Sequence, residues 1–262
     1  MKKLPISAII ASRNEGHLLE ECLNSIQFCS EIIIIDLNST DNTQEIAQSF
    51  DARIIRETNP ALVEELHVKY CTAASNDWLL TYDPDEVVSE ALAAEICELF
   101  ERDIADSKSH VMAPIRYYFK NRMLKGTSWG GLKYRTFLVN RNRYTFSGKV
   151  HLGGAALGDW TALYIPYRGN NHIHHYWMQS WNQLLEKHCR YLEKEGEARF
   201  SAGERTNLLK IVKTPFTIFF KSFVKARGVK DGLTGFLLSL FRAWYFTTAQ
   251  IRLLKYQNNR RK

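Results

Sequence analysis

Two carboxylates separated by a single residue form the clearest chemical motif in this sequence of 262 residues. Asp83, Pro84, Asp85 and Glu86 follow the apolar run WLLTY at 78–82, so we expect them where a buried strand ends. Carboxylates at this spacing can share one hard cation, which often completes its shell with substrate phosphate oxygens. A proline-containing turn at a strand exit has the same composition, so the interpretation depends on the surrounding elements.

Polar residues also follow two earlier apolar runs. The run ISAIIA ends at Ser12, next to Arg13 and Glu15, and the run EIIII ends at Asp36. A carboxylate at such a position accepts strong hydrogen bonds from sugar hydroxyls or base N–H groups. The GxGxxG and GxxxxGK[ST] phosphate loops do not follow these runs, which disfavours a dinucleotide dehydrogenase and a P-loop NTPase.

Strand-like and helix-like segments alternate through the first 105 residues, which predicts parallel strands joined by helices. In an open parallel sheet, ligands bind beyond the carboxyl ends of the strands. From about 109 to 170, short strands alternate with Gly-rich turns and predict a mixed or antiparallel continuation; the chain after 175 is helical in pattern. The expected strands are 6–11, 31–36, 52–57, 77–83, 110–119, 133–140 and 161–167, and the expected early helices are 17–29, 40–50 with Ser39 or Asp41 as caps, 60–75, and 89–103 with Ser89 as cap.

These segments carry a family resemblance. ISAIIASRNE, IIIIDLNSTDNTQEIA and LLTYDPDE resemble the family 2 glycosyltransferases of the GT-A fold. The turn 126–129, the strand with Arg135, Val150-His151 and His175-Tyr176 are similar to a bacterial subgroup that includes lipopolysaccharide-core β-glucosyltransferases. The resemblance implies an α/β domain over 1–204 with a Rossmann-like mixed sheet flanked by helices. Its nucleotide-binding half would be 1–105 and its acceptor half 106–204, followed by a helical appendage at 205–262.

The resemblance also implies a reaction, in which a sugar passes with inversion from a nucleotide-diphosphate sugar, expected to be a UDP-sugar, to an acceptor. A divalent metal, Mg²⁺ or Mn²⁺, would offset the charge of the leaving diphosphate. The subgroup has a Glu after Val-His where this chain has Leu152, so three residues stay open as the general base: His151, Glu86 and Asp159. The other implied roles are the nucleotide contacts Ser12, Arg13, Glu15, Asp36 and Asp83, the metal ligands Asp83, Asp85 and His175, and the acceptor contacts Trp129 and Arg135.

Charge is divided unevenly along the chain. The net charge is +7, yet residues 205–262 hold thirteen Lys/Arg and one acid, and residues 107–158 hold ten Lys/Arg and no acid. Lysines and threonines of 208–225 form a polar helical stripe beside aromatic residues, which predicts a helix lying in a membrane interface. Packing of the same helices on the catalytic domain is the alternative. We therefore expect a cytoplasmic enzyme, peripheral on the inner face of the cell membrane, with a lipid-linked or polysaccharide acceptor.

Composition excludes several other classes. The five cysteines form no CxxC pair, so a disulfide framework and a structural zinc site are disfavoured. The N-terminal apolar run is too short for a signal peptide, and no uncharged apolar stretch reaches 18 residues. A sugar-nucleotidyltransferase should carry a Gly-rich basic loop after its first strand, and the segment ASRNEG does not supply one. A nucleic-acid-binding protein fits poorly, because the excess basic charge lies beside aromatic helices and the body is acidic, so no nucleic-acid partner is expected.

Overall fold

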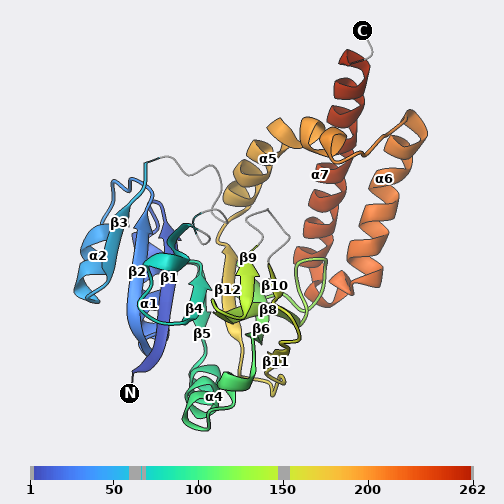
Figure 1. Cartoon of the computed structure of the whole chain (residues 1–262). Helices are drawn as coiled ribbons and strands as arrows, with labels where there is room; N and C mark the ends of the chain where they lie inside the picture. Colours follow the sequence, from blue (N-terminus) through green and yellow to red (C-terminus); the bar gives the residue numbers. More distant parts are fainter. Residues whose placement is uncertain (1–2, 59–65, 67–68, 147–153, 261–262) are drawn as a thin grey trace. The chain divides into compact units, whose positions relative to one another are not determined.

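A computed structural model describes residues 3–58, 66, 69–146 and 154–260. The chain forms two compact units, one from Met1–Ile115 with Lys133–His175 and the other from Arg116–Leu132 with Tyr176–Lys262 (Figure 1). The first unit is an α/β unit and the second is mainly helical. Helix α5 (Trp181–Ser201), which the sequence analysis placed in the acceptor half, belongs by its contacts to the second unit together with α6 and α7.

The first unit is built on a mixed sheet in which four parallel strands are followed by antiparallel ones. The strand order is β3-β2-β1-β4-β8-β6-β12-β5, with β11 parallel to β6. The predicted parallel sheet with a mixed continuation is confirmed. The strands are β1 (Leu4–Ser12), β2 (Cys29–Asp36), β3 (Arg53–Arg56), β4 (Trp78–Tyr82), β5 (Glu86–Val88), β6 (His110–Phe119), β8 (Lys133–Asn140), β11 (Ala162–Tyr164) and β12 (Ile173–Met178), with β9 (Tyr144–Phe146) and β10 (Gly154–Ala156) as a separate pair. The last residues of β6 and β12, together with β7 (Arg122–Met123), belong to the second unit.

The helices of this unit follow the expected strands in sequence. They are α1 (Gly16–Ser25), α2 (Thr43–Ser49) and α4 (Glu90–Glu101), with short 3-10 turns at Cys71–Ala73 and Ala105–Ser107. The predicted cap of α4 is confirmed, because Ser89 Oγ accepts from Leu92 N at 3.2 Å. The cap of α2 differs from the prediction, since Asn42 holds that position and Asp41 lies one residue before it. Half of the predicted helix over 60–75 falls outside the described residues; of the rest, residues 66, 69 and 70 are helical and the 3-10 turn Cys71–Ala73 follows.

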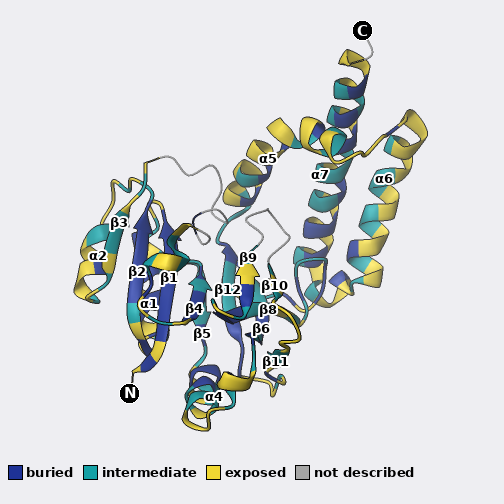
Figure 2. Ribbon diagram, viewed as in Figure 1, coloured by how far each residue is buried: buried dark blue, intermediate teal, exposed yellow. Residues whose placement is uncertain are grey.

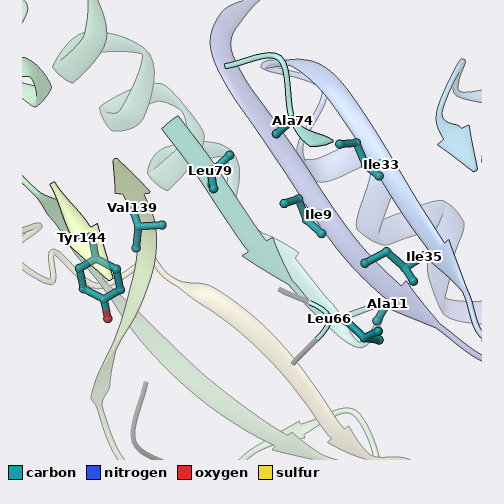
Figure 3. Packing of buried hydrophobic residues seen from close by; sticks show 9 residues of the cluster. All are labelled: Ile9, Ala11, Ile33, Ile35, Leu66, Ala74, Leu79, Val139 and Tyr144. Atoms are coloured by element: carbon teal, nitrogen blue, oxygen red, sulfur yellow. The ribbon is translucent and has the colours of Figure 1, made fainter. Parts of the chain in front are cut away.

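The core of the first unit follows from the alternation of side chains along β-strands. Ile9 and Ala11 of β1, Ile33 and Ile35 of β2, and Leu79 of β4 point to one face of the sheet and pack together (Figure 3). Ile10, Ile34 and Leu80, which alternate with them, are also fully buried. Both faces of the parallel strands are therefore covered, as parallel sheets require. This packing fixes the carboxyl ends of β1, β2 and β4 along one edge.

The second unit contains α5, α6 (Leu208–Phe220) and α7 (Gly232–Asn259), with a π-helical turn at Lys221–Lys225 and a 3-10 turn at Gly228–Asp231 between α6 and α7. Helix α7 contacts both other helices. Ser239 donates to Ser222 at 3.0 Å across the α6–α7 contact, and Arg252 donates to the carbonyl of Leu192 in α5 at 2.7 Å. None of the helices in the described part of the chain has the length and hydropathy that a bilayer-spanning segment requires.

Helix α6 is unusual because none of its residues is fully buried (Figure 2). Its exposed apolar side chains recur every four residues and therefore form one stripe along the helix. A second exposed apolar stripe runs along α7. Phe219 and Phe223 stack on each other, and both make edge-on ring contacts with Phe236, which joins the two helices. We call this surface the apolar face; its members are Leu208, Val212, Phe216, Phe220 and Val224 of α6 and its turn, and Leu233, Phe236, Leu237, Leu240, Trp244 and Ile251 of α7.

Candidate active site at the carboxyl edge of the sheet

Asp36 ends β2 as a fully buried carboxylate whose charge is held by hydrogen bonds. Its Oδ1 accepts from the backbone N–H of Ser39 at 3.0 Å, and its Oδ2 accepts from Gln44 Nε2 at 2.6 Å. Arg56 donates in turn to Gln44 Oε1 at 2.8 Å, so a cation supports the carboxylate through the amide. Ser12 pairs in register with Asp36, and among the described residues no partner lies within bonding distance of its buried hydroxyl. A buried hydroxyl without a partner beside a fixed carboxylate fits a polar ligand group.

The loops after β1 and β2 are bonded to each other. Asn14, whose backbone is left-handed with φ 55°, donates its N–H to Ser39 Oγ at 3.0 Å and accepts from Thr40 N at 2.7 Å. Asp41 accepts from the N–H of Gly16 at 3.0 Å and from that of Thr43 at 3.1 Å. Its carboxylate therefore satisfies the first N–H groups of two helices at once, which accounts for its position just before the cap of α2. Arg13 is exposed and Glu15 half-buried in the same loop.

The motif from Asp83 to Glu86 forms a tight turn between β4 and β5. The N–H of Glu86 donates to the carbonyl of Asp83 at 3.1 Å, and the Glu86 carboxylate accepts weakly from the N–H of Asp83 at 3.4 Å. These two bonds direct the Glu86 side chain into the protein, where it is 0% exposed, and leave Asp83 and Asp85 partly accessible. The turn therefore presents two carboxylates to solvent and uses the third for support.

Glu86 is held by an ion pair with Arg135 of β8. Arg135 donates to Glu86 Oε1 through Nη1 and to the carbonyl of Thr81 through Nη2 at 2.9 Å. Burial raises the pKa of Glu86, and the Arg135 guanidinium opposes that shift. A buried carboxylate with these contacts positions the turn; a general base must instead reach the acceptor hydroxyl. The contacts of Arg135 are likewise internal, although a quarter of its side chain is exposed.

The imidazole of His175 in β12 lies beside Asp85 and Glu86 of the turn. Its Nε2 lies 3.2 Å from Asp85 Oδ2, and its Nδ1 lies 3.5 Å from Glu86 Oε1. The antiparallel pairing of His175 with Glu86 across β12 and β5 sets this approach. Burial lowers the pKa of His175, but the hydrogen bond to Asp85 and the nearby carboxylates outweigh it, so the pKa is raised overall. The imidazole therefore gains positive character beside the carboxylates.

This arrangement fits a divalent cation that the protein and the substrate coordinate together. The described residues contain no cluster of three His, Cys, Asp or Glu side chains that could hold a metal by themselves. Asp85 Oδ2 and His175 Nε2 nevertheless converge within 3.2 Å at the edge where a diphosphate would lie. Mg²⁺ is typically held by one or two carboxylates together with substrate phosphates, and the carboxylates of Asp83 and Asp85 agree with that pattern, whereas an imidazole is not a usual Mg²⁺ ligand.

The structure does not bring every predicted residue to this edge. Asp159 is exposed and lies three residues before Ala162, which pairs with His110 at the start of β6. His110 is level with Leu79 through Val139 of β8, so Asp159 lies toward the opposite end of β4 from Asp83. His151 lies outside the described residues. Trp129 belongs to the second unit, where it stacks on Trp177 with ring centroids 4.8 Å apart.

Two supporting residues were missed by the sequence analysis. Gln44 links Asp36 to Arg56, and Asn14 links the first loop to the second. Asn14 carried a usable signal, because asparagine adopts the left-handed conformation more readily than most residues and stands in the segment SRNE. Gln44 carried none, since a glutamine in the first turn of a helix is usually exposed.

Strand-end carboxylates on a parallel sheet, with a carboxylate–imidazole pair beside them, define an α/β protein with a polar site at its carboxyl edge, where ligands bind in open α/β sheets. The family model described as glycosyl transferase family 2 matches residues 7–158, more than half of the chain. The chain therefore belongs to glycosyl transferase family 2, and the resemblance found in the sequence is confirmed, as are the GT-A fold class and the assignment as an enzyme that transfers glycosyl groups.

Curated relatives match over nearly the whole chain. An uncharacterized glycosyltransferase of Rickettsia bellii (strain RML369-C) is 26% identical over 97% of this chain and 88% of its own length. The lipopolysaccharide core biosynthesis glycosyltransferase LpsC of Rhizobium meliloti (strain 1021) is 27% identical over 94% of this chain and 91% of its own. Among solved structures, glucosyl-3-phosphoglycerate synthase from Mycobacterium tuberculosis with Mn²⁺ and UDP is 20% identical, with a TM-score of 0.31, and the match covers 44% of this chain and 43% of that one.

Proposed function

We propose that this glycosyltransferase moves a sugar from a nucleotide-diphosphate sugar, with a UDP-sugar as the first candidate, to a lipid-linked or cell-envelope saccharide. The observation that carries the proposal is the convergence of Asp36, Ser12, Asp83 and Asp85 on one edge of the sheet. The buried Asp36 and the Ser12 hydroxyl suit the base and ribose, with Arg13 and Glu15 on the adjoining loop. The name of the relative LpsC supports an envelope saccharide as acceptor.

The proposed chemistry is a single displacement at the anomeric carbon. The acceptor hydroxyl oxygen forms the new bond on the face opposite the diphosphate, the bond from the anomeric carbon to the diphosphate oxygen breaks, and the configuration inverts. The hydroxyl proton passes to a base within hydrogen-bond reach. His151 stays our candidate for that base, because Glu86 is enclosed and Asp159 lies at the far end of the sheet.

The leaving diphosphate presents the largest electrostatic demand of this reaction. Asp85 and His175, with Asp83 beside them, would hold a divalent metal, which when bound offsets the negative charge that develops on the diphosphate. Because only a neutral imidazole ligates a metal, binding of the metal at His175 would release the proton that its raised pKa favours. Glu86 and Arg135 keep the turn in place while the ligand binds.

Donor binding gives a direct test that does not depend on the acceptor. UDP with Mn²⁺ should bind the wild-type chain in calorimetry, and Asp85→Asn should lose the metal-dependent part of that affinity. Asp77→Asn is a matched control, because Asp77 is an exposed carboxylate just before the opposite end of β4. Equal UDP affinity for wild type and Asp85→Asn, with and without Mn²⁺, would contradict the assignment of Asp85.

We also propose that residues 205–262 hold the enzyme on a membrane surface through the apolar face. Leu208, Phe216 and Leu233 are each more than 70% exposed, which is costly for large apolar side chains in water. The lysine–threonine stripe of α6 lies beside this face, and basic residues next to aromatic ones suit an anionic leaflet. Helix packing and membrane contact are compatible interpretations of the tail, because α7 packs on α5 within its unit while the apolar face stays exposed.

Point variants test the membrane proposal better than deletion of the tail, because α7 packs against α5 and its loss would disturb that unit. Phe216→Ser/Phe220→Ser should reduce flotation with anionic vesicles. Leu185→Ser/Tyr191→Ser, at exposed apolar sites on α5, is the control. If the wild-type chain does not float with vesicles, or if both variants float equally well with them, the apolar face has another purpose.

A further inference from the structure

A basic cavity in the second unit has no role in the transfer reaction described above. Its volume is about 500 Å³, and its lining includes five cations and no acid. The cations come from two stretches, one around β7 and one in the turn between α6 and α7. They are Arg116, Lys125, Lys225, Arg227 and Lys230.

The two stretches are fixed against each other. The carboxylate of Asp231 accepts from the backbone N–H groups of Lys125 and Gly126, at 2.7 Å each. A Cβ atom on Gly126 would lie 2.0 Å from the carbonyl oxygen of Arg227, so only glycine allows this approach. Arg227 itself adopts a left-handed backbone with φ 57° at the turn. The cavity is therefore formed by direct backbone contact and not by side chains alone.

Four of the five cations of this cavity have no ion-pair partner among the described residues. Within the described chain, the side chains of Lys125, Lys225, Arg227 and Lys230 form neither an ion pair nor a hydrogen bond. Asp231, the one acid of the tail, directs its oxygens to backbone N–H groups. Like charges held close together repel one another, and a bound anion offsets this electrostatic repulsion. Arginine binds phosphate oxygens in pairs, and lysine binds them as a compact charge.

The apolar face ends at the same place. Val224 is 50% exposed immediately before Lys225, and Val229 is 60% exposed between Arg227 and Lys230. A ligand that satisfies both surfaces carries phosphate next to apolar chains. A cavity of this size accommodates a small headgroup and not merely one ion.

We propose that this cavity binds the phosphate group of a membrane lipid, as a phosphomonoester or diphosphate, while the lipid chains lie along the apolar face. The proposal rests on the membrane association proposed above. A phosphomonoester carries a charge of about −1.5 to −2 near neutrality, more than the single charge of a phosphodiester, and so complements several cations better. Nucleic acid offers no apolar portion to the exposed valines at the rim.

The test is flotation of the full chain with two kinds of phosphatidylcholine vesicle. One contains phosphatidic acid, a phosphomonoester, and the other contains phosphatidylglycerol, a phosphodiester, at matched surface charge. The wild-type chain should prefer the first. Lys125→Ala/Lys230→Ala should lose at least about tenfold in affinity for that vesicle, since each basic residue near an anionic surface adds appreciable attraction. Lys194→Ala/Lys255→Ala removes the same charge from exposed positions of α5 and α7 outside the cavity and is the matched control.

The outcomes separate this proposal from membrane association itself. If both variants lose affinity equally on both vesicles, the cavity has no special role, although the apolar face still binds membrane. If the wild-type chain binds neither vesicle, the proposals of membrane association and of lipid-phosphate binding both fail. The proposal of donor binding is tested separately and does not depend on this result. A further arm adds glycerol 3-phosphate in a thermal melt: stabilisation that depends on Lys125 and Lys230, without any vesicle preference, would show that the phosphate belongs to a soluble compound and would overturn the lipid assignment.

Discussion

Replacing Arg135 by methionine tests whether its pair with Glu86 supports the candidate active site. Glu86 is 0% exposed, so the substitution leaves a buried carboxylate without its cation. Removing one partner of a buried pair costs about 3–5 kcal/mol of unfolding free energy. Arg135 is partly solvated and Glu86 can take up a proton, so we expect a loss at the lower limit, about 3 kcal/mol. Arg102→Met, which breaks an exposed pair with Glu98, should change stability little.

The loss should depend on pH in a defined direction. Burial raises the pKa of Glu86, and Arg135 opposes that rise, so the pKa of Glu86 in Arg135→Met should be higher still. The folded variant then keeps a proton that the unfolded chain, with an ordinary Glu pKa of about 4.3, has released. Stability therefore falls as pH rises from the unfolded pKa through the folded one. The difference from wild type should be smallest at acidic pH.

Urea unfolding followed by tryptophan fluorescence, with a chelator present to remove metal, measures these differences. Glu86→Gln should cost less than Arg135→Met, because Arg135 keeps its bond to the Thr81 carbonyl and its solvent contact. The double variant should cost less than the sum of the two single ones. If Arg135→Met loses no more than Arg102→Met, or if its loss does not vary with pH, the buried-charge reasoning is refuted.

Three further outcomes are expected. Asp36→Asn should raise the Michaelis constant for the donor more than it lowers turnover, because Asp36 is proposed to face the nucleoside and not the reacting carbon. Steady-state kinetics with a UDP-sugar checks this, and a defect in turnover alone would show that the role is wrong. Burial raises the pKa of Glu31, but hydrogen bonds from Ser7 and Ser75 outweigh it and lower the pKa overall. Glu31→Gln should therefore destabilise the chain at neutral pH, and the difference in unfolding free energy should vanish as pH falls through that lowered pKa. Urea unfolding across acidic pH checks this, and a constant difference would argue against it. Gly126→Ala should cost at least about 2 kcal/mol in urea unfolding, because its Cβ meets the carbonyl of Arg227, and an unchanged midpoint would mean that the turn can move aside.

Local signals in the sequence account for most of the first unit. The β-branched run before Asp36 predicts a central parallel strand, and Ser89 before an apolar-periodic segment predicts the start of α4; both are confirmed. The carboxyl-edge rule then places Asp36 and Asp83 together without knowledge of any contact. These features depend on periods of two and 3.6 residues, which a single sequence displays directly.

Long-range pairing could not be predicted in the same way. Glu86 and Arg135 are 49 residues apart and meet because β8 pairs antiparallel with β4, a register that no local pattern reveals. The sequence therefore leaves Glu86 open as a base, and the resemblance assigns Arg135 to the acceptor, whereas in the structure the two residues bond to each other. Asp159 shows the same limit, since its distance from Asp83 follows from the parallel pairing of β11 with β6.

The tail shows why composition and packing must be considered together. Helix α7 reads as apolar nearly all round, which favours burial on every side. In the structure α5 and α6 cover two sides of it, and the third side carries Leu233, Leu240 and Trp244 in continuity with the stripe of α6. In the membrane proposal, a further apolar medium covers this third side. The unpaired cations at the turn between α6 and α7 identify the charge that this medium should carry at its surface, which is why the vesicle experiments compare phosphate chemistry and not binding alone.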